Sequence, residues 1–160
     1  MPIYHSLGRI PPKRHTRFDK AGGGYYYEQL FGTEGFHGMA SLLYHTHRPT
    51  KVRDIGQGVE VMPKIAFEKS LVSRKLIGFD VESTDDFLGS RTPLLVNQDV
   101  HIGVASPRTS MAGYFYKNAS ADELLFIHKG SGRLKTMLGT IPFQPGDYLI
   151  IPRGMIYQIY

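Results

Sequence analysis

The residues of this sequence best suited to chemistry are one glutamate in an apolar run and one pair of histidines. Glu123 precedes four apolar residues, and Gly130 follows it after six intervening residues. His45 and His47 are separated by one residue, so in a strand both side chains would face the same side, as metal ligands often do. The sequence has no cysteine, which excludes disulfides, thiolate metal sites and cysteine nucleophiles. The candidate chemistry is therefore that of carboxylate and imidazole.

A second pattern lies further along, where residues 146–154 fit G-x5-P-x-G. Its first two residues predict a turn and the next four a strand with alternating faces. Pro152 ends strand pairing because it has no amide donor, and Gly154 permits the positive φ of the next turn. The pattern resembles the second sequence motif of the cupin β-barrels. Metal-binding cupins place a histidine three residues after the final glycine, and Tyr157 stands there in this sequence.

The first cupin motif, H-x-H-x(3,4)-E-x6-G, is met only in its second half. Glu123 and the following glycine fit, but the histidine positions fall on Lys117 and Ala119, or on Tyr116 and Asn118 in the longer spacing. Two histidines and a carboxylate hold Fe(II) because imidazole suits the ion and three ligands converge on it. A lone carboxylate does not make such a site. We therefore expect no metal-ligating, cofactor-binding or catalytic residue in this segment.

A carboxylate that points into a barrel needs a partner, because an unpaired buried charge is costly. Lys117 occupies a histidine position in the shorter spacing, so a Lys117–Glu123 ion pair is one hypothesis. The alternative is that Glu123 faces solvent or accepts bonds from turn amides. Tyr157 is expected to lean into the barrel with its hydroxyl group bonded.

The histidines offer weaker candidates. No third ligand is evident beside His45 and His47, since Glu28 and His37 could join them only through the tertiary fold. Hydrogen bonding at the surface or between subunits is the favoured interpretation of the pair. Two further histidines occur singly in apolar runs and are expected to be structural: His101 and His128.

The elements that must position these residues are short strands. The sequence has 18 glycines and 10 prolines, which stand at most breaks between short apolar runs. The expected strands are residues 25–31, 40–47, 94–97, 100–105, 113–117, 123–129, 133–138, 141–143, 147–152 and 155–160. Residues 80–91 are acidic and predict a surface loop, while residues 71–77 fit either a strand or a helical turn. We predict an all-β fold, a cupin-type jelly-roll barrel (double-stranded β-helix).

The chain is expected to be organised as an arm and one domain. Residues 1–24 contain three prolines and three consecutive glycines, which disfavour regular structure, and predict an irregular N-terminal arm. Residues 25–160 are expected to form the cupin-like β domain. Because the sequence stops inside an apolar run at Tyr160, we expect either a domain truncated at its C-terminal end or a last strand tied into the sheet.

The formal net charge of +5 is concentrated partly in the arm, in a cluster of Arg9, Lys13, Arg14, His15 and Arg17. No aromatic platform or reader motif accompanies the cluster, so a solvated arm or a subunit contact is favoured over nucleic-acid binding. No apolar run approaches the length of a bilayer span, and the first residues lack the apolar core of a signal peptide. We expect a cytoplasmic protein with no nucleic-acid or membrane partner.

Several stretches resemble the amino-terminal half of the homogentisate 1,2-dioxygenase family. They are YEQLFG (27–32) with SLLY (41–44), LLVNQDV (94–100), and NASADELLFIHKGSG (118–132) running on to GDY (146–148) and IPRG (151–154). The start, with RIP at 9–11 and KRH at 13–15, is similar to a bacterial branch. The resemblance spans nearly the whole chain.

The resemblance implies an Fe(II) enzyme that opens the ring of homogentisate, an aromatic carboxylate, with O2 in tyrosine and phenylalanine catabolism. It also implies a homo-oligomer built from trimers. In the family the iron ligands and the catalytic histidine lie in the carboxyl-terminal half, and no position here matches them. The Fe(II) of the full-length family member is therefore not expected in this segment, which is expected to be inactive by itself.

Three functions remain open at this point. The first is the amino-terminal half of a homogentisate dioxygenase-like enzyme. The second is a non-catalytic cupin module for oligomerisation or for binding a small carboxylate or sugar. The third is a metal-free cupin isomerase, which would need a histidine general base in the barrel, and none can be placed there.

Overall fold

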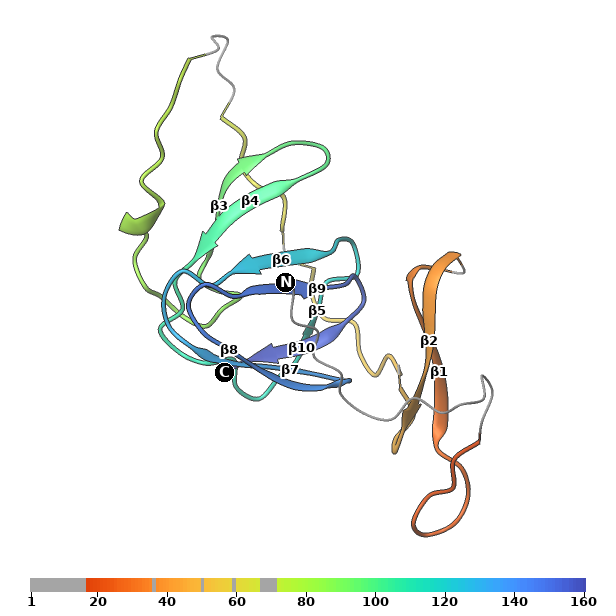
Figure 1. The fold of residues 1–160 in the computed structure, drawn as a ribbon. Coiled ribbons are helices and arrows are strands. Elements are labelled where there is room, and N and C mark those ends of the chain that lie inside the picture. Colours follow the sequence, from red (N-terminus) through yellow and green to blue (C-terminus); the bar gives the residue numbers. More distant parts are fainter. Residues whose placement is uncertain (1–16, 36, 50, 59, 67–71) are drawn as a thin grey trace.

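The computed structural model describes residues 17–160 except 36, 50, 59 and 67–71, and its described part is built almost wholly of strands (Figure 1). The strands are β1 (Tyr27–Glu34), β2 (His37–His45), β3 (Arg91–Val96), β4 (His101–Ala105), β5 (Tyr116–Lys117), β6 (Glu123–Phe126), β7 (Gly132–Thr136), β8 (Gly139–Phe143), β9 (Tyr148–Ile151) and β10 (Ile156–Ile159). The one helical element of the described residues is the 3-10 turn η1 (Gly78–Asp80). The all-β, cupin-like prediction is confirmed.

Two sheets enclose the core. Strands β5, β10, β7 and β8 form a four-stranded sheet in that order, and β6 pairs with β9 beside it (Figure 1). Further two-stranded ladders join β3 to β4 and β1 to β2. The core cluster draws Leu134 from β7, Tyr157 from β10, and Leu149 and Ile151 from β9. The ladders between described strands do not close into one ring, so the structure shows packed sheets rather than a closed barrel.

Local sequence explains why β9 has the bounds that the second motif predicts. Its four residues alternate in burial, with Leu149 and Ile151 inward and Tyr148 and Ile150 outward. The strand ends directly before Pro152, which has no amide to donate to a ladder. Gly146, with φ of 94°, and Gly154, with φ of 83°, make the flanking turns in a region that favours glycine.

The hairpin of β1 and β2 stands to one side of the two sheets (Figure 1). Its contact with the core is made by Phe31, which packs against the core cluster. Residues before β1 fold back on the hairpin: Phe18 meets the ring of Tyr44 edge-on, with ring centroids 4.7 Å apart, and Asp19 bridges to Tyr25. The rest of the predicted arm, residues 1–16, lies outside the described residues, as does most of the basic cluster.

Residues 81–90 form the irregular, turn-like segment that the sequence predicts, but only part of it lies at the surface. Phe87 is 9% exposed and belongs to the core cluster, and Ser90 is only 3% exposed. The segment is held by Asp86, whose carboxylate accepts bonds from the amides of Leu88 and Gly89 at 2.9 and 3.1 Å. Asp86 makes these turn bonds, whereas the other acidic residues of the segment, Asp80, Glu82 and Asp85, are exposed.

The structure also answers the sequence predictions for residues 71–77 and for the last strand. Residues 72–77 form no regular element, and residue 71 lies outside the described part. The last strand is tied into the four-stranded sheet, since Tyr160 and Arg133 exchange backbone hydrogen bonds of 2.7 and 3.1 Å.

No helix among the described residues is both long and apolar enough to cross a membrane.

Candidate functional site

Four elements bring polar side chains to one place inside the sheets. Arg91 opens β3, Asn118 directly follows β5, Glu123 opens β6, and Tyr157 lies in β10. The Arg91 guanidinium donates to both carboxylate oxygens of Glu123, with N···O distances of 2.8 and 3.2 Å. Its second nitrogen also donates to the Tyr157 hydroxyl oxygen at 2.7 Å. We call these four residues the Arg91–Glu123 cluster.

Glu123 is the acceptor at the centre of the cluster. Besides the two bonds from Arg91, it accepts one from the Tyr157 hydroxyl at 2.5 Å and one from the Asn118 side-chain amide at 3.1 Å. The Glu123 side chain is 10% exposed and Tyr157 is fully buried, while Arg91 is 33% exposed. A forked guanidinium–carboxylate pair with further donors is the arrangement that compensates a charge removed from water.

Local structure fixes each donor. The Asn118 side-chain oxygen accepts the amides of Ser120 and Ala121 at 3.0 and 3.1 Å, an Asx turn that aims the amide nitrogen at Glu123. Tyr157 lies opposite Tyr116 in the β10–β5 ladder, and their rings meet edge to face with centroids 5.6 Å apart.

Aromatic rings hold the guanidinium of Arg91 in place. Its carbon lies 4.4 Å from the ring centroid of Phe87 and 5.5 Å from that of Tyr116. Both distances are within the range of cation–π attraction. The turn at residues 85–90 thus supplies one of these rings, that of Phe87, and leads directly into Arg91.

The electrostatics of the cluster favour the ionised pair. Burial raises the pKa of Glu123, but the bonds from Arg91, Tyr157 and Asn118 outweigh it and hold the pKa below its ordinary value. Burial lowers the pKa of Arg91, and the bond to Glu123 more than reverses this, so its pKa is raised. Burial and the bond to Glu123 raise the pKa of Tyr157 well above that of a free phenol. Glu123 is therefore a carboxylate, and Tyr157 a neutral donor.

The cluster occupies the positions that the cupin motifs give to metal ligands. Glu123 is the acid of the first motif, Tyr116 and Asn118 take its histidine positions in the longer spacing, and Tyr157 takes the histidine position of the second. Glu123, Tyr157 and Tyr116 surround the Arg91 guanidinium, and Asn118 donates to Glu123. The Glu123 oxygens are already engaged, and the groups around them are donors, so the residues present do not fit an Fe(II) ion.

The Lys117–Glu123 ion pair is wrong. Lys117 lies opposite Ile156 in the ladder and is exposed, because neighbouring residues of a strand point to opposite faces and Tyr116 points inward. The expectation that Tyr157 leans inward with its hydroxyl bonded is confirmed.

The histidines make local contacts. His45 shares a hydrogen bond of 2.8 Å with the side chain of Gln29 across the β1–β2 ladder, and His47 one of 3.0 Å with Thr46. His128 packs on the ring of Phe79, with centroids 4.6 Å apart, and His101 is exposed on β4. Over the described part of the chain, no three His, Asp or Glu side chains gather as a metal site would require.

Arg91 is the member of the cluster that sequence reasoning missed. It closes an acidic segment that predicts a surface loop, and nothing distinguishes it among 19 lysines and arginines. The available signal is indirect: a Glu123 that points inward from an apolar run needs a cation, and the motif spacing indicates Lys117 rather than Arg91.

Comparison with known proteins gives an informative match. No protein-family model matches the sequence, and no solved structure matches it. A curated protein of Saccharolobus solfataricus, named "Putative dioxygenase SSO1533", is 33% identical over 159 residues. The match covers 99% of this chain and 41% of the relative, so the chain spans about two-fifths of that protein's length.

Proposed function

We propose that this chain is the amino-terminal scaffold part of an iron-dependent, ring-cleaving dioxygenase that acts on homogentisate. The observation that carries the proposal is the match of 99% of the chain to a relative named as a dioxygenase, which extends well beyond the matched region. The resemblance of residues 118–132 and 146–154 to the homogentisate dioxygenase family supports the finer assignment of substrate, Fe(II) and trimer-based assembly.

The geometry of the Arg91–Glu123 cluster supports a scaffold role for this part. The positions that bind metal in other cupins here hold Arg91 against Glu123, which ties β3 to β6 and, through Tyr157, to β10. The cluster has neither a free carboxylate nor a free imidazole to act on a substrate. We infer that the iron ligands and the acid–base groups lie in a different part of the enzyme.

The first experiment uses the whole protein encoded by the reading frame that contains these residues. If the frame continues past Tyr160, the purified protein with Fe(II) is expected to consume O2 in proportion to added homogentisate. The isolated 160 residues are expected to consume none and to retain no iron after gel filtration. Oxygen consumption by the isolated segment, or none by an iron-loaded longer protein, contradicts the proposal.

A second experiment tests the scaffold role by separating iron content from stability. In the longer protein, Glu123→Gln is expected to lower the unfolding midpoint while leaving iron bound per folded protein unchanged. The matched control is Glu82→Gln, at an exposed acidic residue of the segment between η1 and β3 that bonds to no member of the cluster. Loss of iron in step with Glu123→Gln would assign the carboxylate to the metal site and refute the scaffold role.

The alternative is a non-catalytic cupin module for oligomerisation or for binding a small carboxylate or sugar. The apolar outer face of β6 and β9 favours its oligomerisation form. A reading frame that stops at Tyr160, together with no oxygen consumption, selects this alternative.

A further inference from the structure

The side of β6 that faces away from β9 has no strand paired to it among the described residues, and we call it the open edge of β6. Just after β6, the amide of Ile127 donates to Asp147 at 2.9 Å and its carbonyl accepts from Gly146 at 2.8 Å, so both groups point to β9. Backbone direction alternates along an antiparallel ladder, so the groups of Leu124 and Phe126 point to the open edge. Within the described part of the chain no hydrogen bond uses them. Such an edge is a template for a further strand.

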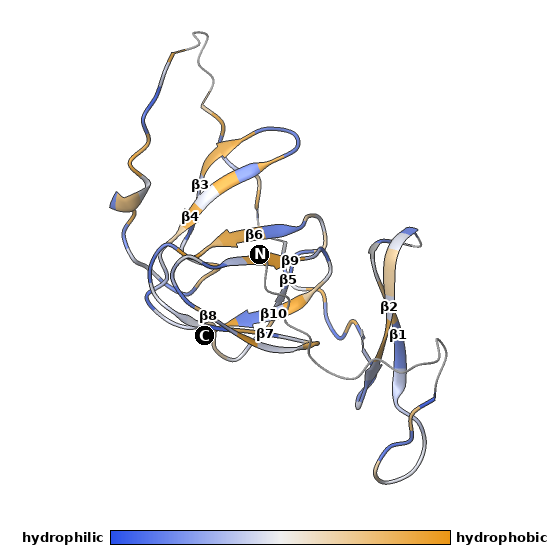
Figure 2. Cartoon of the chain, in the orientation of Figure 1, coloured by the Kyte–Doolittle hydropathy of each residue, from blue (hydrophilic) through white to orange (hydrophobic). Residues whose placement is uncertain are grey.

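The sequence of β6 is that of a central strand rather than an edge strand (Figure 2). Edge strands are commonly protected by lysine or proline, and β6 contains neither. Its one charge, on Glu123, is paired with Arg91. Its inner face packs against the core through Leu125, and its outer-face residues Leu124 and Phe126 are apolar although 64% and 52% exposed. A strand that is apolar on both faces is typical of the interior of a sheet.

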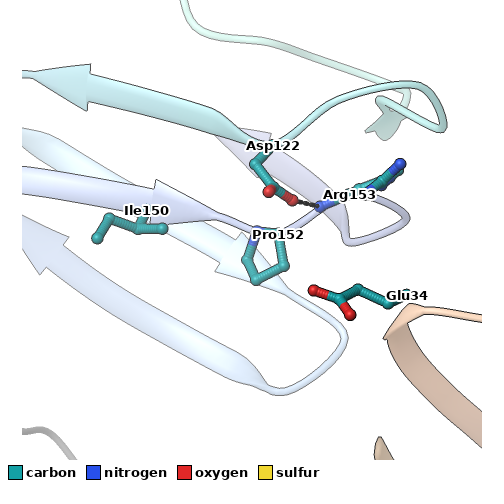
Figure 3. Close-up of a pocket in the computed structure, with 5 residues that line it drawn as sticks. All are labelled: Glu34, Asp122, Ile150, Pro152 and Arg153. Atoms are coloured by element: carbon teal, nitrogen blue, oxygen red, sulfur yellow. Dashed lines mark hydrogen bonds between the residues drawn. The ribbon is translucent and has the colours of Figure 1, made fainter. Parts of the chain in front are cut away.

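The free edge of β9 is closed to strand addition. The positions whose backbone groups point away from β6 are Tyr148 and Ile150, and the next in the alternation is Pro152, which has no amide to donate. Figure 3 shows Glu34 of β1 on the side of Pro152 away from Asp122, and the three residues border one shallow pocket. A proline on the edge and a neighbouring hairpin both hinder pairing there. Of the two edges of this ladder, that of β6 is the one suited to a partner.

The topology of the two sheets indicates where a strand on the open edge would come from. β6 leads to β7 through residues 127–131, and β8 leads to β9 through residues 144–147, so each short connection crosses from one sheet to the other. In the four-stranded sheet β10 lies beside β7, on the side away from β8. The corresponding position in the other sheet is beside β6, on the side away from β9. That position is the open edge, and β10 is the strand opposite it.

The direction of the chain agrees with this position. β7 begins at Gly132, opposite Phe143 at the end of β8, and β10 ends beside them because Tyr160 exchanges backbone hydrogen bonds with Arg133. β6 also runs toward this end, since it leads to β7 through one short connection (Figure 1). A chain that leaves Tyr160 and crosses to the other sheet in the same way would run back antiparallel to β6.

We propose that the open edge of β6 binds a further strand, which is supplied by the polypeptide after Tyr160 in the longer protein and runs antiparallel to β6. The inference rests on the part of the proposed function that makes this chain a piece of a longer protein. The relative supports it, because this chain covers 41% of that protein's length. The added strand pairs with the backbone groups of Leu124 and Phe126 and turns the β6–β9 ladder into a sheet of three strands.

The test is hydrogen–deuterium exchange of the longer protein, read at single residues by mass spectrometry at two protein concentrations. An amide that enters a ladder exchanges slowly. The amides of Leu124 and Phe126 are expected to exchange at least about 100-fold more slowly than those of Tyr148 and Ile150. The latter two are matched controls, because they belong to the same ladder but point to the edge that Pro152 closes.

Proline substitution gives a second readout. Leu124 and Ile150 lie opposite each other in the ladder, and the amide of each points away from it. Leu124→Pro is expected to lower the melting temperature of the longer protein by about 2 °C more than Ile150→Pro, because only the first loses a hydrogen bond to the added strand. Equal shifts contradict the proposal.

The exchange experiment has several outcomes that overturn the proposal. Equal rates at all four amides do so, as does protection of Tyr148 and Ile150 alone, which would place the added strand on β9. Protection of Leu124 and Phe126 that disappears on dilution would assign the strand to a second copy, and a reading frame that stops at Tyr160 leaves no strand to add.

Failure of this inference is distinguishable from failure of the proposed function. Rapid exchange at Leu124 and Phe126 in a longer protein that consumes O2 with homogentisate refutes this inference alone. Protected amides in a longer protein that consumes no O2 refute the proposed function alone.

Discussion

Replacing Arg91 by methionine tests the central claim about the Arg91–Glu123 cluster. Arg91→Met keeps most of the side-chain length and leaves Glu123, 10% exposed, without its cation. Removing one partner of a buried pair costs roughly 3–5 kcal/mol. Because Arg91 is 33% exposed, solvent screens part of the loss, and we expect about 2–3 kcal/mol at neutral pH. For a chain of this size that is a fall in melting temperature of about 5–10 °C.

The pH dependence separates lost charge pairing from lost packing. The pKa of folded Glu123 is lowered, so its contribution to stability is present above the unfolded pKa of about 4.3 and disappears as pH falls through the folded value. In Arg91→Met the pKa of Glu123 rises, and acid neutralises the unpaired carboxylate. The destabilisation caused by Arg91→Met is therefore expected to be largest at neutral pH and to shrink below about pH 4.

Urea unfolding followed by far-ultraviolet circular dichroism measures both quantities, since the protein has no tryptophan to report the transition. Arg133→Met, at an exposed arginine on β7, is the matched control and is expected to change stability by less than about 0.5 kcal/mol. The double variant Arg91→Met/Glu123→Gln is expected to cost less than the sum of its single variants, with a coupling of roughly 1–3 kcal/mol. Equal costs for Arg91→Met and Arg133→Met at pH 7, or a cost that does not vary with pH, would refute the reasoning.

Three further predictions concern the same sheets. Tyr157→Phe removes a fully buried hydroxyl that bonds to Glu123, and it is expected to cost about 1–3 kcal/mol in urea unfolding. The pKa of Tyr157 is raised in the folded protein, so as pH rises the unfolded chain loses the phenol proton of Tyr157 at a lower pH than the folded chain does. The free energy of unfolding of the wild type should therefore fall above about pH 10, and it should fall more steeply than that of Tyr157→Phe. Gly146→Ala, at φ of 94° in open space, is expected to cost about 1–2 kcal/mol, whereas Gly22→Ala, in open space without a positive φ, should cost none. Leu134→Ala, at a core residue that is 4% exposed, is expected to lower the free energy of unfolding by about 2–5 kcal/mol. A loss under about 1 kcal/mol would show that the apolar residues around Leu134 do not form the core.

The features that the sequence could predict are those set by neighbouring residues. The turn at Gly146, the strand that follows and its end before Pro152 depend on backbone rules that act over a few positions. The inward placement of Tyr157 follows from the second motif, because position in a motif fixes which face of a strand a residue takes, whereas the side that Glu123 faces was left open by the sequence.

The partner of Glu123 was not predictable by the same means. Arg91 is 32 positions away, and only the packing of β3 against the sheets brings it near. The acidic composition around it points to the surface, while Phe87 and Ser90 are in fact buried. The exposure of the apolar outer face of β6 and β9 could not be predicted for a similar reason. An apolar run predicts a strand, but it does not indicate which face of that strand the rest of the fold covers.

The long separations within the Arg91–Glu123 cluster set an order of events for a chain that folds as it is made. Arg91 and Tyr157 are 66 positions apart, so contacts this distant in sequence close late and against a large loop entropy. A nascent chain that has exposed β3 and β6 but not yet β10 still lacks Tyr157, and its Glu123 remains open to water. The burial of that one carboxylate therefore depends on β10, the last of the described strands to be made.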